Sequence, residues 1–155
     1  MSTHSEQLAV MFKETLNELE RLYALYPNKF KRGRGYSKGN DAPIKQGNTM
    51  GYYNQNRVNQ KVCMGFPEKL QLDPWQSIIK MFINLIEHEF PGFPWTTIQM
   101  NRNNITEKHI DKCNYGYSIA TSFGNFTSGG EIIQYKKDNT DEVDLLIDTH
   151  NKLVV

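Results

Sequence analysis

The sequence has little cysteine, no long apolar run and no excess of charge of either sign. Two cysteines, Cys63 and Cys113, are too few for a disulfide scaffold and lack the paired spacing of a zinc ribbon. The sequence contains no run of about 18 apolar residues, the length that a membrane-spanning helix needs. Its first residues lack the features of a secretory signal. The net charge of +1 excludes a chain that is strongly basic or acidic as a whole. We therefore expect an intracellular protein of a reducing compartment, the cytoplasm or nucleus, with no membrane partner.

The chain has enough apolar residues for one folded domain. Hydrophobic residues make up 38% of its 155 residues and aromatic residues 12%, which suits a single globular domain. Two segments carry apolar residues at three- and four-residue steps, and we predict helices there. The first covers residues 7–26 and ends before Pro27; the second begins at Asp73 and Pro74 and ends before Pro91.

A long basic segment separates the two predicted helices. Residues 28–66 are rich in Gly, Asn and Gln, and we expect irregular backbone there. Six basic residues lie in its first half, against Asp41 alone: Lys29, Lys31, Arg32, Arg34, Lys38 and Lys45. The segment is either a solvated loop or a nucleic-acid-binding segment, in which Lys29, Lys31, Arg32, Arg34 and Lys38 contact phosphates and nearby tyrosines stack on bases.

From Pro94 onward the pattern changes to short β-rich runs separated by turn residues. We predict strands at residues 95–102, 105–111, 117–123, 130–136, 143–148 and 152–155. Helices followed by a run of short strands indicate an α+β fold, in which N-terminal helices pack on a β-sandwich or barrel.

His109 and Asp111 form the main candidate site. Residues two apart in a strand point to the same face, so the two side chains are expected to converge. An imidazole and a carboxylate on one face are two of the three ligands of the facial triad that holds non-haem Fe(II). Three other interpretations stay open: an ordinary strand histidine paired with Asp111, half of a zinc site with Cys113, or a Cys113 nucleophile with His109 as base.

The residues that follow this motif carry a resemblance to a known family. After the next predicted strand comes Phe123-Gly-Asn-Phe-Thr-Ser-Gly129-Gly130-Glu131-Ile132, in which the two glycines allow a sharp corner where a Cβ would obstruct. This order resembles the double-stranded β-helix, a jelly roll, of the Fe(II)/2-oxoglutarate-dependent dioxygenase superfamily. Residues 93–155 look most like its TET and base-J thymine hydroxylase branch. The resemblance implies one domain, with residues 1–92 as a helical support region and 93–155 as the N-terminal part of the roll.

The resemblance also implies a reaction and its cofactors. His109 and Asp111 would hold Fe(II), with 2-oxoglutarate and O₂ as cosubstrates, and the enzyme would hydroxylate a nucleobase methyl group or a protein side chain. Three residues close to the metal strand in the sequence are candidates for the cosubstrate pocket: Arg102, Asn114 and Ser118.

The end of the chain departs from the family pattern. The superfamily has a distal histidine on a later strand, followed by an arginine. Here the only histidine after Asp111 is His150, within turn composition between two predicted strands, and no arginine follows it. We therefore expect a fragment, an incomplete roll that stops before the distal ligand, with His150 as the remaining candidate for it. The alternative functions are a non-catalytic nucleic-acid-binding β-module that uses Lys29–Lys45, and a structural β-domain without a ligand.

Overall fold

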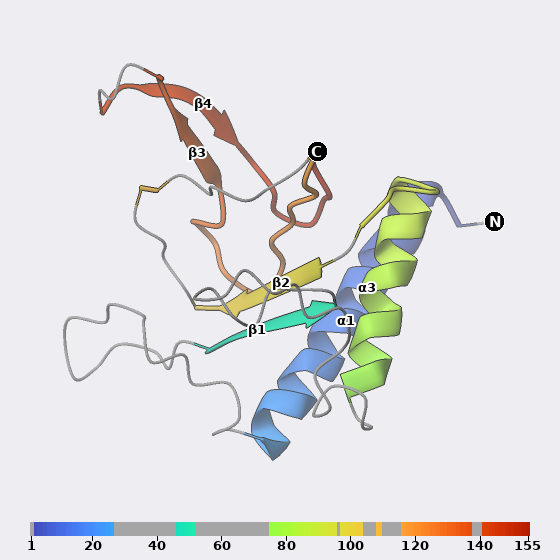
Figure 1. Cartoon of the computed structure of the whole chain (residues 1–155). Coiled ribbons are helices and arrows are strands. Elements are labelled where there is room, and N and C mark those ends of the chain that lie inside the picture. Colours follow the sequence, from blue (N-terminus) through green and yellow to red (C-terminus); the bar gives the residue numbers. More distant parts are fainter. Residues whose placement is uncertain are drawn as a thin grey trace, which may run out of the picture. The chain divides into compact units, whose positions relative to one another are not determined.

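The computed structural model describes residues 2–26, 46–51, 75–95, 97–103, 108–109, 116–137 and 141–155. Its elements are α1 (His4–Leu25), β1 (Gln46–Gly51), α3 (Trp75–Glu89), β2 (Thr97–Arg102), β3 (Ile132–Tyr135) and β4 (Val143–Ile147), as Figure 1 shows. Helices combined with short antiparallel strands confirm the mixed α and β class. None of the described helices is both long and apolar enough to span a bilayer.

The chain divides into two compact units. We call residues 18–109 the central unit, and residues 1–17 together with 110–155 the C-terminal unit. Helix α1 contributes its first part to the C-terminal unit and its last part to the central unit.

Helix α1 begins three residues before its predicted start because its first turn contains a capping box. The Glu6 N–H donates to Thr3 Oγ1 at 3.2 Å, and the Thr3 N–H donates to Glu6 Oε2 at 2.7 Å. The two bonds satisfy amides that have no partner inside the helix. The bond from the Thr3 backbone is also the main reason that the pKa of Glu6 lies below its ordinary value. At its other end the helix stops at Leu25, ahead of Pro27 as predicted.

Apolar faces of α1 and α3 form the core of the central unit. Leu22 and Ile78 are fully buried, and Leu85 is 1% exposed. The other buried apolar side chains of this unit are Leu19, Tyr23, Ile79, Phe82 and Met100. Met100 lies on β2, and the others fall on the faces of α1 and α3 that the three- and four-residue steps of the sequence predicted to be apolar.

Glu18 joins α1 to α3 within the central unit. Arg21 Nε and Nη2 each donate to a Glu18 carboxylate oxygen at 2.7 Å, and Ser77 Oγ donates to Glu18 Oε1 at 2.8 Å. The Arg21 hydrogen bonds are the main cause of the lowered pKa of Glu18, and they outweigh its burial, which acts in the opposite direction.

Strands β1 and β2 pair antiparallel, from Gln46 opposite Arg102 to Gly51 opposite Thr97. The strand predicted at 95–102 is confirmed by β2. The prediction of irregular backbone over 28–66 is wrong for Gln46–Gly51. That segment, QGNTMG, has low β propensity, and its extended form comes from pairing with β2 rather than from its own residues.

In the C-terminal unit β3 and β4 form an antiparallel hairpin, with a bulge between Gln134 and Tyr135. These strands confirm the predictions at 130–136 and 143–148. The strands predicted at 117–123 and 152–155 are wrong in extent. Only isolated pairings involve these segments, Ala120 with Val154 and Ser122 with His150. Positive φ angles at Gly116, Gly124 and Asn151 mark turns that bound the two segments.

The described strands form two separate two-stranded sheets. A jelly-roll core is not among the pairings of the described residues. The strand predicted at 105–111 lies mostly outside these ranges.

Because the Leu22 side chain is fully buried, shortening it should destabilise the fold. We expect Leu22→Ala to lower the free energy of unfolding by about 2–5 kcal/mol, because the change removes apolar contacts and leaves a cavity. Leu25→Ala is the matched control on the same helix, since Leu25 is 57% exposed, and its effect should stay within about 0.5 kcal/mol. Urea unfolding followed by circular dichroism measures both. Equal losses in the two variants would contradict the packing.

We expect the contacts of Glu18 to make the free energy of unfolding depend on pH. Its pKa is lowered on folding, so its contribution is present at pH values above the ordinary pKa of 4.5 and is lost as the pH falls through the lowered value. We expect Glu18→Gln to unfold at a lower urea concentration than the unaltered chain at neutral pH, with the difference closing in acid. Glu14→Gln, at an exposed position of α1, is the control. A Glu18→Gln difference that is constant with pH would refute this role.

Candidate functional site

The two predicted iron ligands are only half described. His109 is exposed and lies outside regular secondary structure, directly after Lys108. Asp111 lies outside the described residues. The convergence of the two side chains therefore stays a prediction from their spacing.

Among the residues predicted to line a cosubstrate pocket, Arg102 has a defined contact. Its guanidinium carbon lies 4.8 Å from the centre of the Tyr23 ring, a cation–π arrangement that joins β2 to α1 in the central unit. Burial raises the pKa of Tyr23, and the charge of Arg102 opposes that effect. Ser118 is exposed, and Asn114 lies outside the described residues.

The residues predicted to contact nucleic acid are not described either. Lys29, Lys31, Arg32, Arg34 and Lys38 all fall within residues 27–45, outside the described ranges. Their role stays a prediction that rests on charge.

A chain of hydroxyl groups links three distant segments of the C-terminal unit. Thr149 Oγ1 donates to the Gly130 carbonyl oxygen at 2.5 Å, and Ser122 Oγ lies 2.8 Å from Thr149 Oγ1. Because Thr149 has a single hydroxyl proton, Ser122 is the donor in the second bond. Backbone bonds reinforce the link, since the Ser122 N–H donates to the Thr149 carbonyl oxygen at 3.0 Å. We call Ser122, Gly130 and Thr149 the hydroxyl junction.

Position 130 of the junction requires a glycine for two reasons: its backbone has a positive φ angle, and neighbouring atoms fill the space that a Cβ would need. Its φ of +84° is unfavourable for residues with a side chain, and an added Cβ would lie 2.7 Å from Ser122 Oγ and 3.0 Å from Phe126 Cζ. Gly129, with a φ of +89°, has no atom within 4 Å of the same position. The obstructed corner predicted at Gly129-Gly130 is therefore confirmed at Gly130. No residue pattern indicated the contact between Ser122 and Thr149, which are 27 residues apart.

His150 lies next to the junction and packs against an aromatic ring. The centres of the His150 and Phe126 rings are 4.3 Å apart, and the His150 N–H donates to Asp148 Oδ1 at 2.9 Å. Its Nε2 is buried, with no hydrogen-bond partner among the described residues. Within those residues His150 belongs to no group of three metal-ligating side chains.

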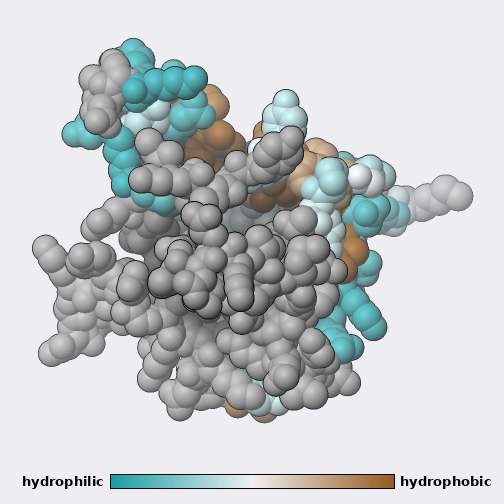
Figure 2. All heavy atoms as spheres, viewed as in Figure 1, coloured by the Kyte–Doolittle hydropathy of each residue, from teal (hydrophilic) through white to brown (hydrophobic). Residues whose placement is uncertain are grey.

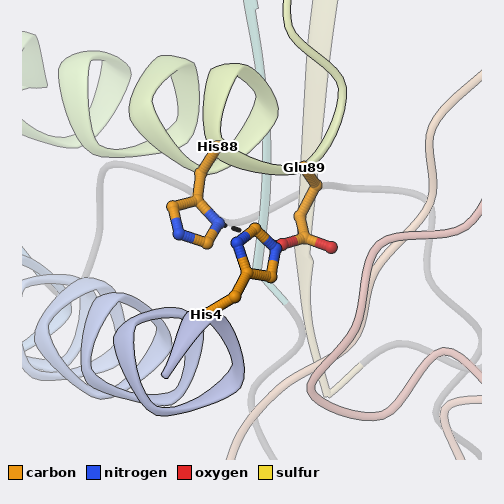
Figure 3. Close-up of side chains that lie close together, drawn as sticks. All are labelled: His4, His88 and Glu89. Carbon is orange, nitrogen blue, oxygen red and sulfur yellow. Dashed lines mark hydrogen bonds and ion pairs between the residues drawn. The ribbon is translucent and has the colours of Figure 1, made fainter. Parts of the chain in front are cut away.

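A second imidazole and carboxylate meet at the end of α3. His88 Nδ1 lies 2.9 Å from Glu89 Oε1, and the two side chains are 18% and 20% exposed (Figure 3). Figure 3 also labels His4, from the first turn of α1, which belongs to the C-terminal unit. Adjacent residues in contact at a helix end form no metal centre by themselves.

Comparison with known proteins identifies no relative. No family model matches the chain, and no curated protein or solved structure is significantly similar to it. The resemblance to dioxygenases therefore rests on the residues of this chain alone.

The hydroxyl junction predicts unequal effects of two adjacent substitutions. Gly129→Ala and Gly130→Ala both place a side chain at positive φ, which costs about 1–2 kcal/mol. Gly130→Ala should cost about 1–3 kcal/mol more, because its Cβ overlaps Ser122 Oγ and Phe126. Thermal unfolding of the two variants measures the difference. Equal destabilisation would show that the corner is not packed as described.

Proposed function

We propose that this chain belongs to an Fe(II)/2-oxoglutarate-dependent dioxygenase that hydroxylates a nucleobase methyl group or a protein side chain. The observation that carries the proposal is the order of residues in the sequence: His109-x-Asp111, a β-rich run, an aromatic turn, and then Gly129-Gly130-Glu131. At Gly130 neighbouring atoms fill the space that a Cβ would need. This supports the interpretation of Gly129-Gly130 as a structural corner rather than a chance pair of small residues.

The chemistry of the donor set fits the metal. A neutral imidazole and a monodentate carboxylate are ligands that suit Fe(II) and leave positions open for a cosubstrate and O₂. When bound, Fe(II) with 2-oxoglutarate supplies the oxidation of a C–H bond. His109 would contribute a ring nitrogen and Asp111 a carboxylate oxygen. His109 is exposed, so that an ion in solution can reach it.

The hydroxyl junction would hold the corner of the proposed roll rather than touch a reactant. It fixes Ser122 and Gly130 to Thr149 through hydrogen bonds of 2.8 and 2.5 Å. A site that positions one C–H bond against an oxidant needs a scaffold that tolerates little displacement. This role depends on contacts among residues 122–150 and not on the identity of the substrate.

The local charge of residues 28–47 favours a nucleic acid as the substrate. Residues 28–47 hold six basic residues and one acidic residue, and such segments bind phosphate backbones. The same segment supports the alternative function, a nucleic-acid-binding module without a metal. The two functions differ in whether binding and activity need His109 and Asp111.

Metal titration tests the proposal on the chain itself. We expect anaerobic titration with Co(II), a spectroscopic substitute for Fe(II), to show a site that His109→Ala and Asp111→Ala each weaken by about 100-fold, more than the loss of an outer-shell partner.

Cys113→Ser is the control for the titration, because Cys113 is the thiol that a zinc site with His109 would use. It should leave Co(II) affinity unchanged. Loss of affinity in Cys113→Ser would favour the zinc site instead. Salt-dependent DNA binding that needs no metal, together with Co(II) affinity that is the same in His109→Ala, would favour the non-catalytic module.

A further inference from the structure

The β3–β4 hairpin carries exposed apolar side chains on both of its faces. Ile133 and Leu146 are cross-strand neighbours and share one face. Ile132, opposite Ile147, and Leu145, opposite Gln134, lie on the other face, because residues two apart on a strand point the same way. These four side chains are 41–60% exposed. In Figure 2, viewed as in Figure 1, brown and teal side chains lie together over the hairpin. A two-stranded hairpin is marginal by itself and gains stability from further strands.

The outer edge of β3 is oriented for such a strand. The Lys136 N–H donates to the Glu142 carbonyl oxygen at 3.1 Å, so the peptide groups of Lys136 point toward β4. Because this direction alternates along a strand, those of Ile133 point to the outer edge. Among the described strands, β4 is the one neighbour of β3.

We propose that the outer edge of β3 pairs antiparallel with β3 of a second copy of this chain, about a two-fold axis. Residues that face each other across two antiparallel strands have side chains on the same face of the sheet. A two-fold axis normal to the sheet keeps each residue on its face in both copies. The two copies of one residue must therefore lie opposite each other on the axis. With Gln134 on the axis, Ile133 lies opposite Tyr135 of the second copy. Just beyond the paired strands, Glu131, which directly precedes β3, comes beside Lys137 of the second copy, which lies in the turn that follows β3.

Charge complementarity favours this register. Glu131 and Lys137 are both exposed, and neither forms an ion pair within the described residues. The two-fold axis generates the Glu131–Lys137 pair twice, once at each end of the β3–β3 contact. Opposite charges directly across a strand pair stabilise it, and like charges destabilise it.

The outer edge of β4 lacks this complementarity. The acidic residues on and beside β4 are Asp141, Glu142, Asp144 and Asp148, with no basic residue between them. A two-fold pairing of β4 centred on Leu145 would set Glu142 opposite Asp148 of the second copy. Within the chain these carboxylates already pair with Lys136 and Lys152, at 2.6 and 2.7 Å, so this register adds no new ion pair. The second copy therefore pairs through β3, giving a four-stranded sheet in the order β4-β3-β3-β4.

A charge swap on the full chain tests the proposal by sedimentation equilibrium. The unaltered chain should show a monomer–dimer equilibrium that weakens with added salt. Glu131→Lys and Lys137→Glu should each raise the dimer dissociation constant by about 10-fold, because each turns two attractive pairs into repulsive ones. The double variant E131K/K137E restores both pairs and should return the constant to its original value.

Asp141→Lys is the control on the β4 side of the hairpin, since it makes the same change of charge as Glu131→Lys and should leave the dissociation constant unchanged. Circular dichroism checks that every variant keeps its fold. A chain that stays monomeric at every concentration overturns the proposal. So does a dimer that the single swaps do not weaken, or one that the double swap does not rescue. None of these outcomes involves His109 or Asp111, so the result is independent of the proposed function.

Discussion

The bond from Thr149 to the carbonyl oxygen of Gly130 is the contact on which the C-terminal unit depends. It exists because Gly130 has no side chain, since a Cβ there would occupy the space of Ser122 Oγ, the donor of the next bond. Gly130 lies two residues before β3, and Thr149 lies two residues after β4. One hydroxyl thus closes the base of the hairpin, where both strands leave the packed part of the unit.

The packing around this bond explains which parts of the unit are buried. Thr149 is 2% exposed, and the ring of the next residue, His150, lies with its centre 4.3 Å from that of Phe126, the two rings being tilted by 31°. Phe12, 4% exposed, packs on Phe123, the residue after Ser122, with ring centres 5.3 Å apart. A buried hydroxyl needs a partner for each polar atom, and an aromatic surround strengthens those bonds by excluding water. Beyond this base, the aliphatic side chains of the hairpin remain exposed.

Local patterns predicted local structure well. The apolar steps around Leu22 and Ile78 identified both helices, because burial of one helix face leaves its period in the sequence. The capping box at Thr3 and Glu6 was not part of the prediction, which therefore began the helix at residue 7 instead of His4. The strand Gln46–Gly51 could not be predicted, because glycine and asparagine carry no β signal and the partner β2 lies far along the chain.

In the candidate site, too, local features could be predicted from the sequence and long-range contacts could not. Gly129-Gly130 indicated a corner, since two adjacent glycines are a local signal, and Gly130 does turn where a side chain cannot fit. Nothing local linked Ser122 to Thr149, which are 27 residues apart and which ordinary strand composition would leave at the surface. For His109 and Asp111 the spacing predicts a shared face, and their joint position stays a prediction. Polar contacts between residues far apart in the sequence are thus the part of this fold that local residue patterns could not predict.

The distribution of charge along the hairpin completes the argument about its edges. Lys136 with Glu142 and Gln134 with Asp144 hold the two strands together across the sheet. Glu131 lies directly before β3 and Lys137 two residues after it, so the two ends of this strand carry opposite charges. The charged residues on and beside β4 are acidic, and two of them pair within the chain, Glu142 with Lys136 and Asp148 with Lys152. An edge with opposite charges at its two ends matches itself under a two-fold rotation, and an edge of one sign repels itself. Charged residues on an edge strand limit unwanted pairing. In this hairpin they block one edge and specify the register of the other.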